Sequence, residues 1–310
     1  MSVILSSTNQ IRKSNEIESP KGVLQYLLLH KNILLELTKF RITFFVSVTT
    51  IVGFIFYKGQ INYNLFIVSL GVLFLAAGAS ALNEYQERNL DGKMQRTISR
   101  PIPSGRISSR YALIATSILI IIGSFILSLV SVTVLLLGIF TLIWYNAVYT
   151  PLKNISPFAI IPGSLVGSLP PMIGWAAAGG NLFDVRILSL AGFLFIWQIP
   201  HFWLLVLMYD DQYKKAGFPT LSNIFSHSQI ENITYLLMVV LVFSSFIFPV
   251  LENSYSIFTI FLFIVFGFLS IFFTFSKSKD KENNIFRNKF VIINLYVLSI
   301  LLLITAETLI

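Results

Sequence analysis

The chain has 310 residues, of which 55% are hydrophobic and only 12% are charged, and its formal net charge is +8. A soluble globular domain of this composition would lack the polar side chains needed to cover its surface, so that class is excluded and lipid is the expected solvent. Cysteine is absent, which excludes disulfides, thiolate catalysis and sulfur ligands to metals.

The N-terminal residues are polar, and the apolar stretch 23–37 that follows is interrupted by Lys31 and Glu36. This pattern argues against a cleaved signal peptide. We predict that residues 1–35 form a cytoplasmic arm lying partly along the membrane interface. Residues 36–310 are predicted to form one intramembrane domain.

Nine apolar segments are long enough to cross about 30 Å of hydrocarbon, which takes roughly 20 helical residues. They are residues 43–58, 64–82, 111–130, 132–148, 158–178, 187–208, 234–252, 255–275 and 290–309. The expected fold class is therefore all-α, a polytopic membrane protein with about nine transmembrane helices.

Basic residues segregate strongly between the two sides of this arrangement. With nine spans, the N-terminal arm and the connections near 85–110, 151–157, 210–233 and 276–289 share one side. Only Lys58 and Arg186 of the 22 lysines and arginines fall on the other side. The positive-inside rule then places the N-terminus in the cytoplasm and the C-terminus outside, in the cell (inner) membrane. The net charge thus needs no nucleic-acid partner.

An acidic pattern follows the second span. Asn83, Glu87 and Asp91 recur every four residues, so on a helix their oxygens line one face. Hard oxygen ligands of this kind suit Mg²⁺, which takes one or two carboxylates, waters and a substrate phosphate. We therefore predict a metal site at the cytoplasmic face.

Four cations follow the acidic pattern: Lys93, Arg96, Arg100 and Arg106. A polyanion such as a diphosphate would explain acids and bases together, with the metal holding some oxygens and the cations the others. Pro101 and Pro103 indicate a shaped lid. The alternative is a charged connection whose acids pair with its own bases in solvent.

Two later segments add candidates on the same side. Asp210 and Asp211 lie at the end of the sixth span, where they either form a second acidic centre or merely mark a helix end at the interface. Lys153 is a candidate for binding an anionic group of a substrate. Alternatively, it anchors its connection at the membrane interface.

Prolines and glycines crowd the segment from Tyr145 to Trp175. Pro162, Pro170 and Pro171 are expected to break or thin the helix, which is tolerated where backbone lines a cavity. Close helix packing through the small residues of this segment is the alternative.

These motifs together resemble a known family. The pattern Asn83-x3-Glu87-x3-Asp91-x2-Met94-x-Arg96-Thr97-x2-Arg100-Pro101 resembles the first acidic motif of the UbiA-type intramembrane prenyltransferases. The motifs Tyr149-Thr150-x2-Lys153, Pro170-Pro171-x2-Gly174-Trp175 and Trp197-Gln198-x-Pro200-His201-Phe202-Trp203 narrow the resemblance to the branch that farnesylates protoheme IX. It covers roughly residues 35–225 by motif.

The resemblance implies nine helices around a central cavity, with Mg²⁺ as cofactor and farnesyl diphosphate and protoheme IX as substrates. The product would be heme O, which a downstream enzyme converts to heme A. That enzyme is therefore an expected partner. The metal ligands would be Asn83, Glu87, Asp91 and Asp211. The diphosphate would bind Lys93, Arg96, Arg100 and Lys153, and the acceptor Tyr149, His201 and Asp210.

This sequence departs from the family pattern in details. Glu87 and Asn89 stand where related enzymes usually have Asp, and Gln212 stands where an acidic residue is common. Phe40 replaces a usual Pro after Lys39. The metal cluster is therefore one carboxylate poorer, and the second centre is less defined than the first.

Three alternatives remain open at this point. His201 either contacts the heme iron or a propionate, or bonds a backbone group near the Pro200 kink. The acceptor of a UbiA-type transferase could also be another molecule, such as a quinone precursor. A transporter is the alternative from a different class, although carboxylates clustered at one interface disfavour transport.

Overall fold

The computed structural model describes residues 23–252, 255–275 and 282–310, and all regular elements in these ranges are helices. They are α2 (Val23–Leu37), α3 (Phe40–Lys58), α4 (Tyr63–Asp91), α5 (Ser109–Ser128), α6 (Val132–Ile143), α7 (Thr150–Leu152), α8 (Ile160–Ala177), α9 (Val185–Met208), α10 (Asp210–Ala216), α11 (His227–Ser245), α12 (Ile247–Leu251), α13 (Ile257–Phe275) and α14 (Glu282–Leu309). A π-helical turn, Trp144–Tyr149, joins α6 to α7. Short 3-10 turns cover Pro157–Ala159 and Leu221–Asn223.

Nine helical segments of the described part are long and apolar enough to span a membrane. Seven of them are α3, α4, α5, α9, α13, most of α14, and α8 with the 3-10 turn before it. The other two are Val132–Leu152, in which α6, the π-helical turn and α7 are continuous, and Ser228–Leu251, in which α11 continues into α12. The predicted all-α, multi-pass fold is confirmed.

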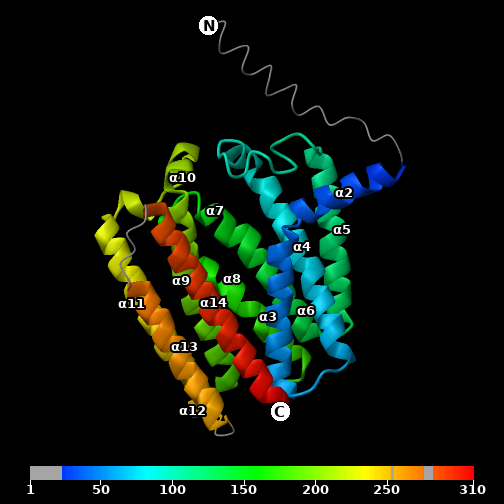
Figure 1. The fold of residues 1–310 in the computed structure, drawn as a ribbon. Coiled ribbons are helices and arrows are strands. Elements are labelled where there is room, and N and C mark those ends of the chain that lie inside the picture. Colours follow the sequence, from blue (N-terminus) through cyan, green and yellow to red (C-terminus); the bar gives the residue numbers. More distant parts are fainter. Residues whose placement is uncertain (1–22, 253–254, 276–281) are drawn as a thin grey trace, which may run out of the picture.

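The ends of the helix bundle differ in what they carry. Figure 1 shows α2, α10 and the connection 92–108 at one end, and the C-terminus at the other. We call the first of these the polar end. The connection carries Lys93, Arg96, Arg100 and Arg106, and α10 carries Lys214 and Lys215, so two of the basic segments assigned to one side lie at the same end of the bundle. The predicted arm 1–35 is described only from Val23 onward, and its interfacial position stays a prediction.

Helices α3 and α8 approach closely through glycines. A Cβ atom on Gly53 would lie 2.0 Å from the carbonyl oxygen of Pro171, and one on Gly174 would lie 1.9 Å from the carbonyl oxygen of Thr50. Lipid tails are as apolar as the helices, so association depends on such close van der Waals packing. For Gly174, the alternative of close helix packing through small residues is therefore correct.

The prolines do not break the fifth span, although the segment does line a cavity, as predicted, through Gly163, Gly167 and Pro170. Pro170 and Pro171 lie inside α8, which stays helical from Ile160 to Ala177. Both prolines are buried, and α3 covers this part of the helix. Neighbouring helices make proline tolerable within a membrane span. The irregular backbone lies instead in the π-helical turn of the preceding span, a feature common at functional sites.

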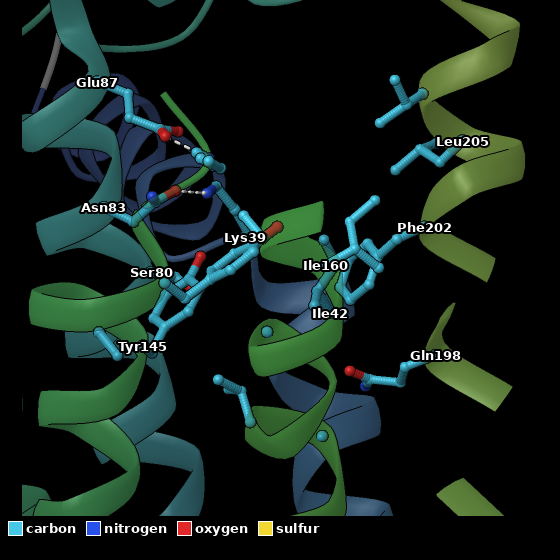
Figure 2. Close-up of a pocket in the computed structure, with 18 of the residues that line it drawn as sticks. Lys39, Ile42, Ser80, Asn83, Glu87, Tyr145, Ile160, Gln198, Phe202 and Leu205 are labelled. Atoms are coloured by element: carbon cyan, nitrogen blue, oxygen red, sulfur yellow. Dashed lines mark hydrogen bonds and ion pairs between the residues drawn. The ribbon is translucent and has the colours of Figure 1, made fainter. Parts of the chain in front are cut away.

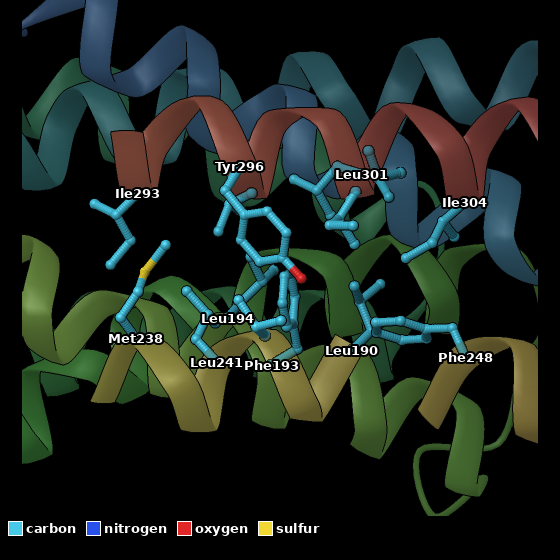
Figure 3. Close-up of a cluster of buried hydrophobic side chains, with 14 of the residues drawn as sticks. Leu190, Phe193, Leu194, Met238, Leu241, Phe248, Ile293, Tyr296, Leu301 and Ile304 are labelled. Carbon is cyan, nitrogen blue, oxygen red and sulfur yellow. The ribbon is translucent and has the colours of Figure 1, made fainter. Parts of the chain in front are cut away.

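An apolar cluster fixes α9 against α11, α12 and α14 (Figure 3). Leu190, Phe193 and Leu194 of α9 are fully buried in it. Tyr296 of α14 satisfies its hydroxyl by bonding Ser245 at 2.7 Å. A neighbouring face of α9, which carries Gln198, Phe202 and Val206, lines a cavity with α8.

Candidate active site

The acidic pattern forms the last two turns of α4, which continues past the predicted apolar span to Asp91. Asn83, Glu87 and Asp91 are 2%, 5% and 1% exposed, and all three line one cavity of about 330 Å³. The predicted helical face of oxygens is therefore present. It faces the interior of the protein, which is inconsistent with a solvated charged connection.

Each of these three side chains contacts a cation from a different part of the chain. Lys39 Nζ donates to Asn83 Oδ1 at 2.7 Å, and Lys153 forms an ion pair with Glu87 (Figure 2). Arg100 Nη1 lies 2.6 Å from Asp91 Oδ2. Two carboxylates thus face three basic side chains, which leaves the polar end of the cavity attractive to an anion.

Lys39 is a candidate site residue that sequence reasoning missed. It lies just before α3 with φ 50°, in the left-handed region that non-glycine residues rarely adopt. Burial lowers the pKa of Lys39 to about 7, and repulsion from Arg100 and Lys153 contributes to the shift. Its sequence signals were a lysine at the start of a span and its place in the family pattern before Phe40, and neither predicts the contact with α4, which joins residues 44 positions apart.

Of the four cations that follow the acidic pattern, Arg96 and Arg100 line the cavity. Arg96 also fastens the connection to α10. Its Nη2 donates to the Tyr213 hydroxyl at 3.0 Å, and its backbone N–H donates to Gln212 Oε1 at 3.0 Å. Lys93 is exposed and is not part of the cavity wall.

The predicted second acidic centre does not join the first in this structure. Asp210 accepts from the Ser222 hydroxyl at 2.7 Å and pairs with Lys214, and Asp211 is exposed. Neither residue lines the cavity. Tyr213, which does, is two residues from Asp211, and about 200° of helical rotation separates the two side chains.

The acceptor candidates separate in the same way. Tyr149 of the π-helical turn lines the cavity and packs against Phe202 of α9, with ring centroids 6.3 Å apart. His201 does not line it: the Nδ1 atom lies 2.8 Å from Asn294 Oδ1 of α14, and the ring packs on Phe290. The geometry therefore favours a packing role for His201, although its partner is a side chain and not backbone.

The α4 face fits a magnesium ion with substrate. Asn83, Glu87 and Asp91 supply one amide and two carboxylates at one wall of the cavity, which matches the few protein ligands that Mg²⁺ takes beside phosphate and water. Among the described residues, no three His, Asp or Glu side chains gather closely enough to hold a metal by themselves. A substrate phosphate would therefore have to complete the shell.

Below this polar end the cavity is largely apolar. Its walls come from α3, α4, the span that contains α6, α8 and α9. Val46, Leu75, Leu142, Ile173 and Val206 are among the side chains that line it. An elongated apolar molecule with an anionic head would match both regions.

The family model described as the UbiA prenyltransferase family matches residues 46–298. A relative from Geobacter sulfurreducens is named protoheme IX farnesyltransferase and is 41% identical over 179 residues, which are 58% of this chain and 66% of that protein. The match spans just under two thirds of that relative. A Bartonella henselae protein of the same name is 37% identical over 239 residues, 75% of this chain and 76% of that protein.

Solved structures share the fold. A structure described as that of digeranylgeranylglyceryl phosphate synthase has a TM-score of 0.73 at 17% identity, covering 90% of this chain and 98% of that one. A UbiA homolog from Archaeoglobus fulgidus bound to GPP and Mg²⁺ has a TM-score of 0.66, also at 17% identity, covering 88% of this chain and 99% of that one. Because the family model matches residues 46–298 of it, the chain belongs to the UbiA prenyltransferase family.

Proposed function

We propose that the protein transfers the farnesyl group of farnesyl diphosphate to a vinyl group of protoheme IX and so forms heme O. The observation that carries the proposal is the buried oxygen face of α4, met by three cations at the end of an apolar cavity. Relatives that cover most of the chain are named for this reaction.

The cations are the groups that would hold the diphosphate. Lys39, Lys153 and Arg100 now contact the oxygens of α4 and would turn to the phosphate oxygens as a metal takes their place. Arg96 lines the same end and is held by α10. Bound Mg²⁺ would supply charge neutralisation that eases departure of the diphosphate.

Carbon–carbon bond formation would occur where the polar end meets the apolar walls. As the diphosphate leaves, C1 of the farnesyl group develops cationic character, and the electron-rich vinyl group attacks it. The aromatic side chains of Tyr145, Tyr149 and Phe202 line this region and suit a developing cation. The apolar walls keep bulk water away until the bond has formed.

For the acceptor, Tyr149 remains the candidate contact among the three predicted residues, because it alone lines the cavity. We assign His201 to the packing of α9 on α14 and Asp210 to the anchoring of α10 through Ser222. The transporter alternative is not supported, since the charged side chains of the cavity gather at its polar end.

The polar end is proposed to face the cytoplasm of the cell (inner) membrane, because it carries the basic connections. Farnesyl diphosphate would then enter from the side on which its charge is soluble. The downstream enzyme that uses heme O stays a predicted partner.

The test is an assay of the purified full-length protein with heme B, farnesyl diphosphate and Mg²⁺, with products identified by mass spectrometry. We expect a farnesylated, hydrated heme. A protein that leaves heme B unchanged but farnesylates a quinone precursor would refute the acceptor and keep the reaction class.

A further inference from the structure

Gln198 places a polar side chain in the apolar part of the cavity. It comes from α9, where Gln198, Phe202 and Val206 line the cavity at a spacing of four residues. Figure 2 shows the Gln198 amide pointing from α9 toward α8, below Phe202. One helical turn, about 6 Å of rise, separates Gln198 from Phe202, the ring that packs on Tyr149 near the polar end.

Two glycines of α8 admit side chains at this depth. A Cβ atom on Gly163 would lie 2.5 Å from the ring of Tyr149, and one on Gly167 would lie 1.6 Å from Gln198 Nε2. The Gln198 amide therefore occupies space that any other residue at position 167 would fill. The end of the Gln198 side chain therefore lies directly against the backbone of α8.

The amide oxygen of Gln198 is buried and has no hydrogen-bond partner among the described residues. An unsatisfied buried acceptor costs about 1–3 kcal/mol, so such a group calls for a donor that binds it. Gly163 and Pro170, which line the cavity about one turn to either side of Gly167 on α8, offer no side-chain donor, and neither does Phe202, one turn away on α9. A water molecule in the cavity is a donor of the right size.

We propose that Gln198 Oε1 holds the water molecule that adds to the cation left on the acceptor after farnesyl transfer. The inference rests on the proposed function and deepens it. The C1–oxygen bond of farnesyl diphosphate breaks and its electron pair leaves with the diphosphate. The vinyl π pair forms the new carbon–carbon bond, which leaves a cation on the vinyl carbon attached to the porphyrin ring.

That cation has two fates. A water oxygen donates a lone pair to it and gives an alcohol, with the released proton passing to the diphosphate. Otherwise the neighbouring carbon loses a proton, and the product is an alkene lighter by one water. Gln198 favours the alcohol because its acceptor oxygen keeps one water beside the cation while the apolar walls exclude others.

The experiment measures the ratio of alcohol to alkene product formed by the purified full-length protein from heme B and farnesyl diphosphate. Gln198→Leu removes the acceptor, and Gly167→Ala displaces the amide. Both should lower the ratio at least about tenfold, equivalent to about 1.4 kcal/mol. Gln198→Glu keeps an acceptor oxygen at this position and should retain most of the alcohol.

Gly192→Ala is the matched control, because a Cβ atom there meets nothing within 4 Å. It should leave the product ratio unchanged. An unchanged ratio in Gln198→Leu and Gly167→Ala would overturn the assignment, as would equal loss of both products in a folded variant. If Gln198→Leu does not fold, Gly167→Ala decides. Failure of the proposed function is seen separately, when the unmodified protein gives no farnesylated heme.

Discussion

At the scale of single residues, the candidate site is defined by oxygens that already have cationic partners. Asn83, Glu87 and Asp91 are buried, and their contacts with Lys39, Lys153 and Arg100 keep them solvated by protein groups. Removing one partner of a buried pair leaves the other uncompensated, which is strongly unfavourable. The activity of each variant at these positions should therefore be compared with its melting temperature, which shows whether the variant folds.

Asp91 and Asp211 separate the first acidic centre from the predicted second one. Asp91→Asn should lower kcat at least about a hundredfold, equivalent to about 2.7 kcal/mol, because it removes a carboxylate from the proposed metal site. Asp211→Asn should change kcat by less than about twofold, since Asp211 is exposed outside the cavity. Turnover at saturating Mg²⁺ is the measurement. Equal losses in both variants would show that α10 moves its carboxylate into the site.

Arg100 and Arg106 test diphosphate binding against membrane topology. Arg100→Ala should raise the farnesyl diphosphate KM or lower kcat at least about tenfold, or about 1.4 kcal/mol. Arg100→Lys should restore part of the loss, because an ammonium lacks the planar fork of guanidinium. Kinetics across a range of farnesyl diphosphate concentrations provides the measurement.

Arg106→Ala is the control for this pair, since Arg106 pairs with Glu36 of α2 and does not line the cavity. It should leave both constants unchanged. Lys277 and Lys279, which carry charge in a remote connection, lie outside the described residues and are predicted to be equally inert. Small, equal effects at all these positions would mean that the basic connection serves orientation only.

At the scale of helices, contacts through small residues set which faces form the cavity. Gly53 and Gly174 bring α3 against α8, while the apolar cluster around Phe193 holds α9 against α11 and α14. α8 and α9 then enclose the cavity with α4 and the π-helical turn. The orientation of each helix about its own axis therefore decides which of its side chains can meet a substrate.

Gly174→Ala tests this packing. The added Cβ would lie 1.9 Å from the Thr50 carbonyl oxygen, so α3 and α8 would have to separate. Overpacking of this kind typically costs about 1–3 kcal/mol, and we expect a lower melting temperature in detergent. Gly192→Ala should melt like the unmodified protein. A Gly174→Ala protein of unchanged melting temperature would contradict the close approach of the two helices.

At the scale of the whole molecule, the charge asymmetry predicts the topology. Fusing a reporter after Ile310 should place it outside the cytoplasm, and a reporter inserted after Ser104 should be cytoplasmic. The connection 92–108, which contains Ser104, and the C-terminus lie at opposite ends of the bundle. Paired fusions to a reporter active only in the cytoplasm and one active only outside it provide the measurement. Cytoplasmic activity at Ile310 would refute the predicted orientation.

The sequence by itself determined the features that depend on local periodicity. Nine apolar lengths fixed the count of spans, because hydrocarbon thickness sets helix length. The spacing of Asn83, Glu87 and Asp91 fixed a shared helix face, because a helix repeats every 3.6 residues. Both predictions depend on the helix alone and not on the helices that pack against it.

Only the tertiary structure decided which side chains meet. Lys39 reaches Asn83 across 44 positions of sequence, while His201 turns toward α14 and Gln198 toward α8 from the same motif. The sequence motif contains both His201 and Gln198, but it does not say how α9 is rotated about its axis relative to its neighbours. The motif therefore could not predict that the two side chains would meet different helices. That rotation is set by packing of the apolar cluster on one side and the glycines of α8 on the other, and both are long-range contacts.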